Sequence, residues 1–277
     1  MSETAYPSGL GASTEDGITL MGLDLAEDLM GRVGFGELVL WLCRQRRPRP
    51  GEVRLFEAVL VALADHGFTP TAIAARLTYL SAPDALQGAF AAGLLGGGSR
   101  FLGVTEDTGR FLAEALAGRE LPEPGAEPER WDELARAVLA ETRAARRLVA
   151  GLGHPVHKVL DPRTPRLIAI AREEGSFGPH LALFEAIGRV HPEILGRRLV
   201  LNGAGVCGAA LMDLGVPSAV LRGVALVARA GGLLGQLAEE ARAPVGMDIY
   251  LHVERHARFE AHPYPDAGPA PAGHGEG

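Results

Sequence analysis

Apolar residues recur along most of the chain at the three- and four-residue spacing of amphipathic helices. The clearest case is residues 52–64, where one helix face would carry Val53, Phe56, Val59, Leu60 and Leu63. Similar signals predict helices over residues 35–43, 69–77, 85–95, 106–117, 131–152, 164–174, 180–190, 200–214 and 221–241. Thr69-Pro70 and Thr164-Pro165 each pair an N-cap residue with a proline at the first helical position. Because no segment alternates apolar and polar residues as a half-buried strand does, the pattern predicts an all-α protein.

Both ends of the chain differ from this pattern. Residues 1–16 are polar and rich in glycine and serine, and residues 263–277 consist largely of proline, glycine and alanine. Such segments bury too little apolar surface to fold alone, so both are predicted to be disordered.

Composition narrows the class of protein. Hydrophobic residues make up 47% of the chain but aromatic residues only 5%, so the core must consist of alanine, leucine and valine in closely packed helices. The net charge of -7 argues against a general nucleic-acid partner. The basic run 44–49 is interpreted as a solvated turn, with attraction of a phosphorylated ligand as the alternative. The positive mean hydropathy suggests additional buried surface, such as a subunit interface.

The two cysteines and the first residues of the chain indicate the cellular compartment. Cys43 and Cys207 lie in apolar stretches and are read as buried thiols, which fits a reducing cytoplasm. No basic-then-apolar leader begins the chain, and no uncharged apolar run reaches about 18 residues. We therefore expect a cytoplasmic protein with no membrane partner.

The segment from Gly151 to Arg163 carries the strongest chemical signal. It contains two glycines, two histidines, a lysine and an Asp-Pro-Arg tripeptide. Glycines let the backbone approach a ligand, imidazole exchanges protons near neutral pH, and arginine grips carboxylate or phosphate. The segment therefore predicts a site for a small anionic substrate that needs proton transfer. The His154–His157 spacing alone is a weak metal signal, and no metal is predicted.

Four further positions have two readings each. Arg163 opposes the dipole at a helix start, which favours a ligand role over simple capping. His66, in Asp65-His66-Gly67, fits an ordinary helix end as well as a site. Arg229 interrupts an apolar helix and is either half of a buried ion pair or a carboxylate ligand. Arg242, beside Pro244, is either a helix-end cation or a ligand.

Taken in order, these residues resemble the citrate synthase superfamily, and more closely the citryl-CoA lyase module of ATP-citrate lyase. The resemblance covers about residues 17–255. It rests on five motifs: Ala64-Asp65-His66-Gly67, Gly151-Leu152-Gly153-His154 with Asp161-Pro162-Arg163, Leu199-Val200-Leu201-Asn202, Ala228-Arg229-Ala230-Gly231, and Arg242-Ala243-Pro244.

The resemblance implies a helical homodimer in which each chain has a large domain (17–109 and 216–262) and a small domain (110–215), with the site in the cleft between them. His154 would be the catalytic residue, hydrogen-bonded to the oxygen of the oxaloacetate or citryl group. His66, Arg163 and Arg229 would bind carboxylates, and Arg242 would do so from the partner subunit. Gly151, Gly153 and Lys158 would lie near coenzyme A, which enters as part of the substrate and not as a permanent cofactor.

Two departures shape the expected function. The segment 96–103 lacks the family's histidine and carries Arg100-Phe101, which resembles a pair in the lyase module. After Asn202, Gly203-Ala204 stands where the family has Val-Asp, so the acid–base aspartate is missing. We expect an enzyme that makes or breaks a carbon–carbon bond between an acyl-CoA (acetyl-CoA) and an oxo acid (oxaloacetate). The alternatives are a thioester hydrolase on the same scaffold and a non-catalytic protein that binds CoA or an organic acid.

Overall fold

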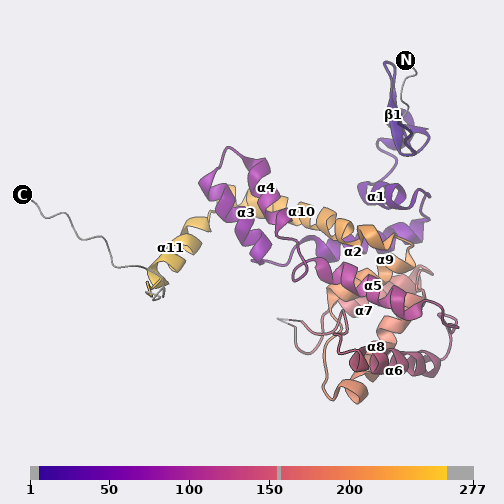
Figure 1. Cartoon of the computed structure of the whole chain (residues 1–277). Coiled ribbons are helices and arrows are strands. Elements are labelled where there is room, and N and C mark those ends of the chain that lie inside the picture. Colours follow the sequence, from indigo (N-terminus) through magenta and orange to yellow (C-terminus); the bar gives the residue numbers. More distant parts are fainter. Residues whose placement is uncertain (1–5, 155–156, 261–277) are drawn as a thin grey trace, which may run out of the picture.

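The chain folds mainly into helices, as the computed structural model of residues 6–154 and 157–260 shows (Figure 1). Every predicted helix is present, and the all-helical class is confirmed for the body of the protein. The helices are α1 (Phe35–Arg44), α2 (Pro50–Ala64), α3 (Pro70–Ser81), α4 (Leu86–Leu95), α5 (Gly103–Leu116), α6 (Pro128–Ala144), α7 (Arg163–Glu173), α8 (Pro179–Leu195), α9 (Gly203–Asp213), α10 (Leu221–Arg242) and α11 (Gly246–His256), with short η1 (Leu25–Leu29) and η2 (Ser218–Val220).

The long helix α10 connects the α3–α4 pair to the body of the molecule. It packs against α2, α3, α4 and α5, whereas α6 and α8 pair with each other at the opposite end, as Figure 1 shows. The main hydrophobic cluster draws on α1, α2 and α5 to α10, and a smaller one joins α3, α4 and α10. The main cluster crosses the expected boundaries at 109/110 and 215/216, so the division into large and small domains stays a prediction.

Glycines let helices cross at backbone contact. A Cβ added at Gly208 of α9 would lie 2.2 Å from the carbonyl oxygen of Thr105 in α5. A Cβ at Gly232 of α10 would lie 1.9 Å from the carbonyl oxygen of Ala64, at the end of α2. The second crossing matters for function because it brings α10 against the turn that carries His66.

The N-terminal region departs from the prediction. Strands β1 (Gly11–Ser13), β2 (Ile18–Leu20) and β3 (Leu23–Asp24) form an antiparallel sheet, with Gly11 opposite Leu20. The expectation that all of 1–16 is disordered is therefore wrong for β1. Backbone pairing across tight turns, such as the hydrogen bond from the amide of Thr14 to the carbonyl of Gly17 (2.9 Å), does not need apolar alternation. The predicted disordered tail, 263–277, lies outside the described residues.

Two helix boundaries also differ. The helix predicted over 131–152 ends at Ala144, because Arg146 adopts a left-handed conformation and residues 151–153 pair with 200–202 instead. The predicted cap at Thr164 is wrong: α7 begins at Arg163, and the Thr164 hydroxyl donates to the Leu201 carbonyl at 2.9 Å. The cap at Thr69 is confirmed.

One helix meets the length and composition criteria for a membrane span, although the sequence contains no uncharged apolar run of about 18 residues. It is the stretch Ser218–Arg242, which contains α10. The core helix of a globular fold passes the same test, and α10 packs against four other helices. The absence of a membrane partner stays a prediction.

Candidate active site

A cavity of about 400 Å³ lies where the predicted site residues meet. Its walls come from the α2–α3 turn, the segment before α5, the 151–163 loop, the start of α9 and the middle of α10. They include His66, Phe68, Thr69, Arg100, Phe101, Gly153, His154, Arg163, Asn202, Ala204 and Arg229. Four predicted arginine and histidine residues that are up to 163 positions apart, from His66 to Arg229, therefore share one cavity.

The loop bearing His154 is held in place by backbone hydrogen bonds. The amide of Asn202 donates to the carbonyl of Gly151 (2.9 Å), and the amide of Gly153 donates to the carbonyl of Val200 (2.7 Å). The Asn202 side-chain amide adds a bond to the Gly153 carbonyl (2.8 Å). Gly151 and Gly153 have φ angles of 84° and 86°, and a Cβ at Gly151 would lie 2.6 Å from the ring of Phe184. Glycine is therefore required at Gly151 for both conformation and space.

A hydrogen bond sets the protonation of His154. Its Nδ1 accepts from the backbone N–H of His157 at 2.9 Å. A ring nitrogen that accepts carries no proton, so in the neutral ring the proton is on Nε2. Burial and the neighbouring His157 lower the pKa of His154, Asp161 opposes them, and Arg163 and His66 lower the pKa further. The side chain is therefore a neutral Nε2–H donor at the cavity wall.

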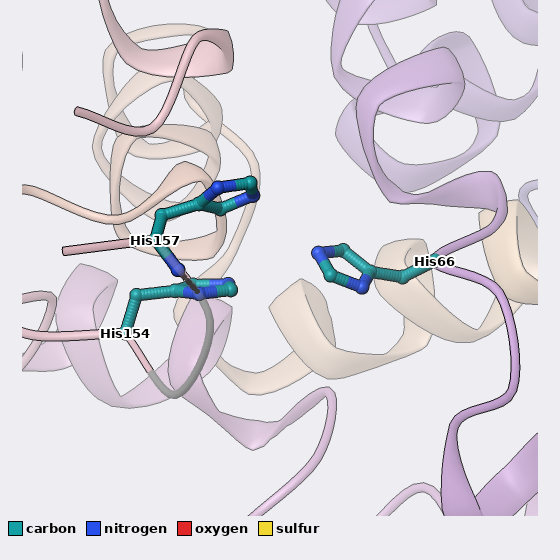
Figure 2. Close-up of side chains that lie close together, drawn as sticks. All are labelled: His66, His154 and His157. Carbon is teal, nitrogen blue, oxygen red and sulfur yellow. Dashed lines mark hydrogen bonds between the residues drawn. The ribbon is translucent and has the colours of Figure 1, made fainter. Parts of the chain in front are cut away.

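Three imidazoles face one another across this space (Figure 2). The ring centroids of His154 and His157 are 4.5 Å apart, and that of His66 lies 5.5 Å from His154 and 5.9 Å from His157. One ring nitrogen from each lies within 4.8 Å of the others, a spacing that a metal ion can bridge. However, a metal-bound histidine normally donates its second ring N–H, whereas Nδ1 of His154 accepts. The donor set is thus poorly suited to a metal.

Arg163 is anchored by a carboxylate. Its Nε and Nη2 donate to the Asp161 carboxylate at 2.9 and 2.7 Å, and its Nη1 donates to the Ala62 carbonyl at 3.2 Å. Asp161 is fully buried, and it also accepts from the amide of Gly203 at 2.7 Å. Burial alone would raise the pKa of Asp161, but these bonds lower it to about 2. The pair fixes the guanidinium at the cavity wall, with a fifth of the side chain exposed.

Gly203 makes this pair sterically possible. A Cβ at position 203 would lie 2.1 Å from Nε of Arg163. The glycine that replaces the expected valine is therefore matched to the orientation of Arg163. The neighbouring Ala204 lines the cavity with a methyl group in place of the expected carboxylate.

Arg229 is buried without an ion-pair partner among the described residues. Its Nε donates to the Leu63 carbonyl and its Nη1 to the Thr69 hydroxyl, both at 3.3 Å. Desolvation lowers its pKa, with Asp65 opposing. The buried-ion-pair reading is therefore not found in this part of the chain. A buried cation at a cavity wall, bonded only to neutral groups, is suited to an anionic ligand.

Of the remaining predicted residues, only Gly153 also lines this cavity. Gly151 and Gly153 border an adjoining cavity of about 660 Å³, which also includes Arg147 and Arg197. The Lys158 ammonium donates to the His154 carbonyl at 2.8 Å and lines neither cavity. Arg242 is exposed at the end of α10, 13 residues or about 20 Å along the helix from Arg229. A single copy of the chain thus does not bring Arg242 to its own cavity.

Several residues that form the site were not among the predicted site residues. Asn202 lines the cavity and Asp161 supports Arg163 from behind the wall. The sequence signal for both was their position within the motifs that carry predicted residues. Arg100, Phe101 and Thr69 line the cavity directly. His157 faces His154 although it was considered only as a weak metal ligand.

Comparisons with known proteins identify the family and the fold. A family model described as citrate synthase, C-terminal domain, matches residues 24–248, so the chain belongs to the citrate synthase family. No curated protein sequence matches it.

Among solved structures, the chain is similar to citryl-CoA lyase from Hydrogenobacter thermophilus, with 27% identity, coverage of 94% of this chain and 96% of that one, and a TM-score of 0.81. The fold also matches ATP citrate lyase from Methanothrix soehngenii in complex with citrate and coenzyme A (21% identity, 98% and 44% coverage, TM-score 0.76). It matches a Thermoplasma acidophilum citrate synthase in complex with carboxymethyl coenzyme A and oxaloacetate (18% identity, 87% and 59% coverage, TM-score 0.60). Family and fold together support a citrate synthase-like role in forming or cleaving carbon–carbon bonds.

Proposed function

We propose that the chain is an enzyme that cleaves, or in reverse forms, the carbon–carbon bond between an acetyl-CoA unit and oxaloacetate, with citryl-CoA as the thioester. The observation that carries the proposal is the neutral His154 Nε2–H beside two anchored arginines at one cavity wall. Cleavage of citryl-CoA is a retro-aldol reaction. Its hydroxyl oxygen becomes a ketone oxygen, and a positioned N–H donor stabilises the charge that develops there.

The arginines suit the acid portion of this substrate. Arg229 is buried and bonded only to neutral oxygens, and Arg163 is held by Asp161 with donors left over. In our proposal both bind carboxylates, and His66, which lies across from His154 (Figure 2), binds a third group. Orientation by fixed cations lowers the entropic cost of reaching the reactive geometry.

The adjoining cavity is the proposed place of the coenzyme A portion. It shares Val104, Gly153 and Asn202 with the first cavity, so one substrate could extend through both. Arg147 and Arg197 supply positive charge for phosphate groups, and Gly151 and Gly153 let the backbone approach the thioester. CoA is substrate here, and no permanent cofactor is proposed.

A homodimer would complete the site. An apolar groove of about 540 Å³ lies along α10 and includes Phe35, Val61 and Leu234, which are 72%, 76% and 54% exposed. Exposed apolar surface of this kind is typical of subunit contacts. We propose that a second copy covers it and that its Arg242 reaches this chain's cavity. Leu234→Glu should then give monomers in light scattering and raise the KM for the acid substrate. Arg242→Ala should raise the same KM while the protein remains a dimer.

The direct test is incubation of the protein with citryl-CoA, followed by mass spectrometry of the products. We expect oxaloacetate and acetyl-CoA in equal amounts, with a loss of about 10²–10³-fold in kcat for His154→Ala because one oxyanion donor is removed. His256→Ala, on the exposed face of α11, is the matched control. Free CoA without a keto acid would indicate the hydrolase instead. Thermal stabilisation by CoA without turnover would indicate a non-catalytic binder.

The cytoplasm remains the proposed compartment. Both cysteines are free thiols, as is usual in a reducing environment. The expectation of no nucleic-acid partner also stays a prediction.

A further inference from the structure

His157 is a titratable group at the site for which the proposed function has no role. Its ring lies 4.5 Å from that of His154, tilted by 34°, and faces His66 edge-on (Figure 2). Its backbone N–H holds Nδ1 of His154, so both rings are carried by one short loop. No hydrogen bond of the His157 ring occurs among the described residues. The half-buried ring does not itself line the cavity but lies directly beside His154, which does.

The two carboxylates that flank this cavity, Asp161 and Asp65, are already engaged, and the adjoining cavity adds the exposed Asp107 of α5. Asp161 is bound by Arg163 and by the amide of Gly203. Asp65 accepts from the amide of Gly67 and the side chain of Gln236, both at 2.9 Å. None of the residues that line the cavity is acidic.

Position 204, where the family places its acid–base aspartate, carries only a methyl group in this chain. Proton transfer at the reacting carbon still requires a group that can both accept and donate near neutral pH, and imidazole is the side chain suited to this. His154 is committed as a donor through Nε2, and His66 lies on the carboxylate-binding wall beside Thr69 and Arg229. His157 is left as the imidazole whose position beside His154 fits the task.

We propose that His157 performs the proton transfer for which the chain lacks an aspartate. The inference rests on the proposed function and names a further catalytic residue for it. Neutral His157 takes the hydroxyl proton of the citryl group while His154 donates a hydrogen bond to the same oxygen. The carbon–carbon bond breaks, leaving a ketone and the enolate of acetyl-CoA, and the His157 imidazolium returns its proton to the enolate carbon. One proton moves from oxygen to carbon, and no net charge is created.

The test separates proton transfer from bond cleavage. The first measurement is kcat and KM for citryl-CoA cleavage. The second is exchange of the methyl hydrogens of acetyl-CoA with D₂O in the presence of malate, which occupies the acid site but has no ketone to attack. His157→Gln keeps hydrogen bonding but cannot carry a proton. We expect it to lose about 10²–10⁴-fold in both kcat and exchange rate, with KM and melting temperature unchanged. His256→Gln is the matched control.

A restoring variant makes the test specific. Adding Ala204→Asp to His157→Gln should recover the exchange rate by at least roughly tenfold, because a carboxylate returns to the acid–base position. If His157→Gln lowers the melting temperature, His157→Asn serves as the second variant.

The possible outcomes are distinct. If the wild type cleaves citryl-CoA and His157→Gln cleaves it at the same rate, this inference is wrong and the proposed function stands. If His66→Gln abolishes exchange with KM unchanged while His157→Gln does not, the proton carrier is His66 and the inference is likewise overturned. If the wild type does not cleave citryl-CoA, both proposals fail.

Discussion

The Arg163–Asp161 pair offers the most quantitative test of the site. Asp161→Asn keeps the shape of the side chain and one acceptor oxygen but removes the charge that holds the guanidinium. Asp161 is fully buried, so solvent screens the interaction little. We expect the variant to be less stable than the wild type at neutral pH and to bind the acid substrate more weakly.

The magnitude follows from the pKa of Asp161, which is lowered from 3.8 to about 2. At 1.36 kcal/mol per pH unit, this shift corresponds to roughly 2.5 kcal/mol of stability. Because the folded-state pKa is the lower one, the contribution is fully present above pH 3.8 and is lost as the pH falls through about 2. At pH 3 roughly half of it should remain. Breaking a fully buried pair costs about 3–5 kcal/mol, but Arg163 is partly exposed, so we expect the lower end of that range at most.

The assay is urea unfolding of both proteins at several pH values between 7 and 3. The difference in unfolding free energy should be about 2–3 kcal/mol at pH 7 and should shrink below pH 4. Asp84→Asn, at an exposed position between α3 and α4, is the control and should show no such trend. A difference that stays constant from pH 7 to pH 3, or that never exceeds about 1 kcal/mol, would refute the linkage.

Three further predictions concern close packing. Gly203→Ala places a Cβ 2.1 Å from Nε of Arg163, so the KM for the acid substrate should rise at least roughly tenfold; an unchanged KM would contradict the role of Gly203. Gly208→Ala places a Cβ 2.2 Å from the Thr105 carbonyl oxygen and should destabilise the protein by about 1–3 kcal/mol in urea unfolding, whereas wild-type stability would exclude a tight α5–α9 crossing. Burial raises the pKa of Cys207 to about 12, so mass spectrometry should detect its alkylation by iodoacetamide at pH 8 only in unfolded protein, and equal rates in native and unfolded protein would disprove this.

The sequence determined the helices and the order of the motifs. Amphipathic spacing is a local property, and it located every helix from α1 to α10 because each buries one apolar stripe. Local pattern failed where long-range pairing decided the structure. Residues 145–152 continue the apolar pattern of α6, yet they leave the helix because residues 151–153 pair with 200–202. Helix α11 was not predicted from the apolar pattern.

Only the tertiary structure decided how the site residues are charged and paired. The sequence marked His66, His154, Arg163 and Arg229 as candidates. It did not show that Arg163 is held by Asp161, or that Arg229 bonds only to neutral groups among the residues that the structure describes. Nor could it show which nitrogen of His154 carries the proton, since this depends on the direction of one backbone N–H. The physical reason is common to all of these. Charge pairing and proton placement depend on distances between groups that the chain brings together from distant positions, and residue order alone does not contain those distances.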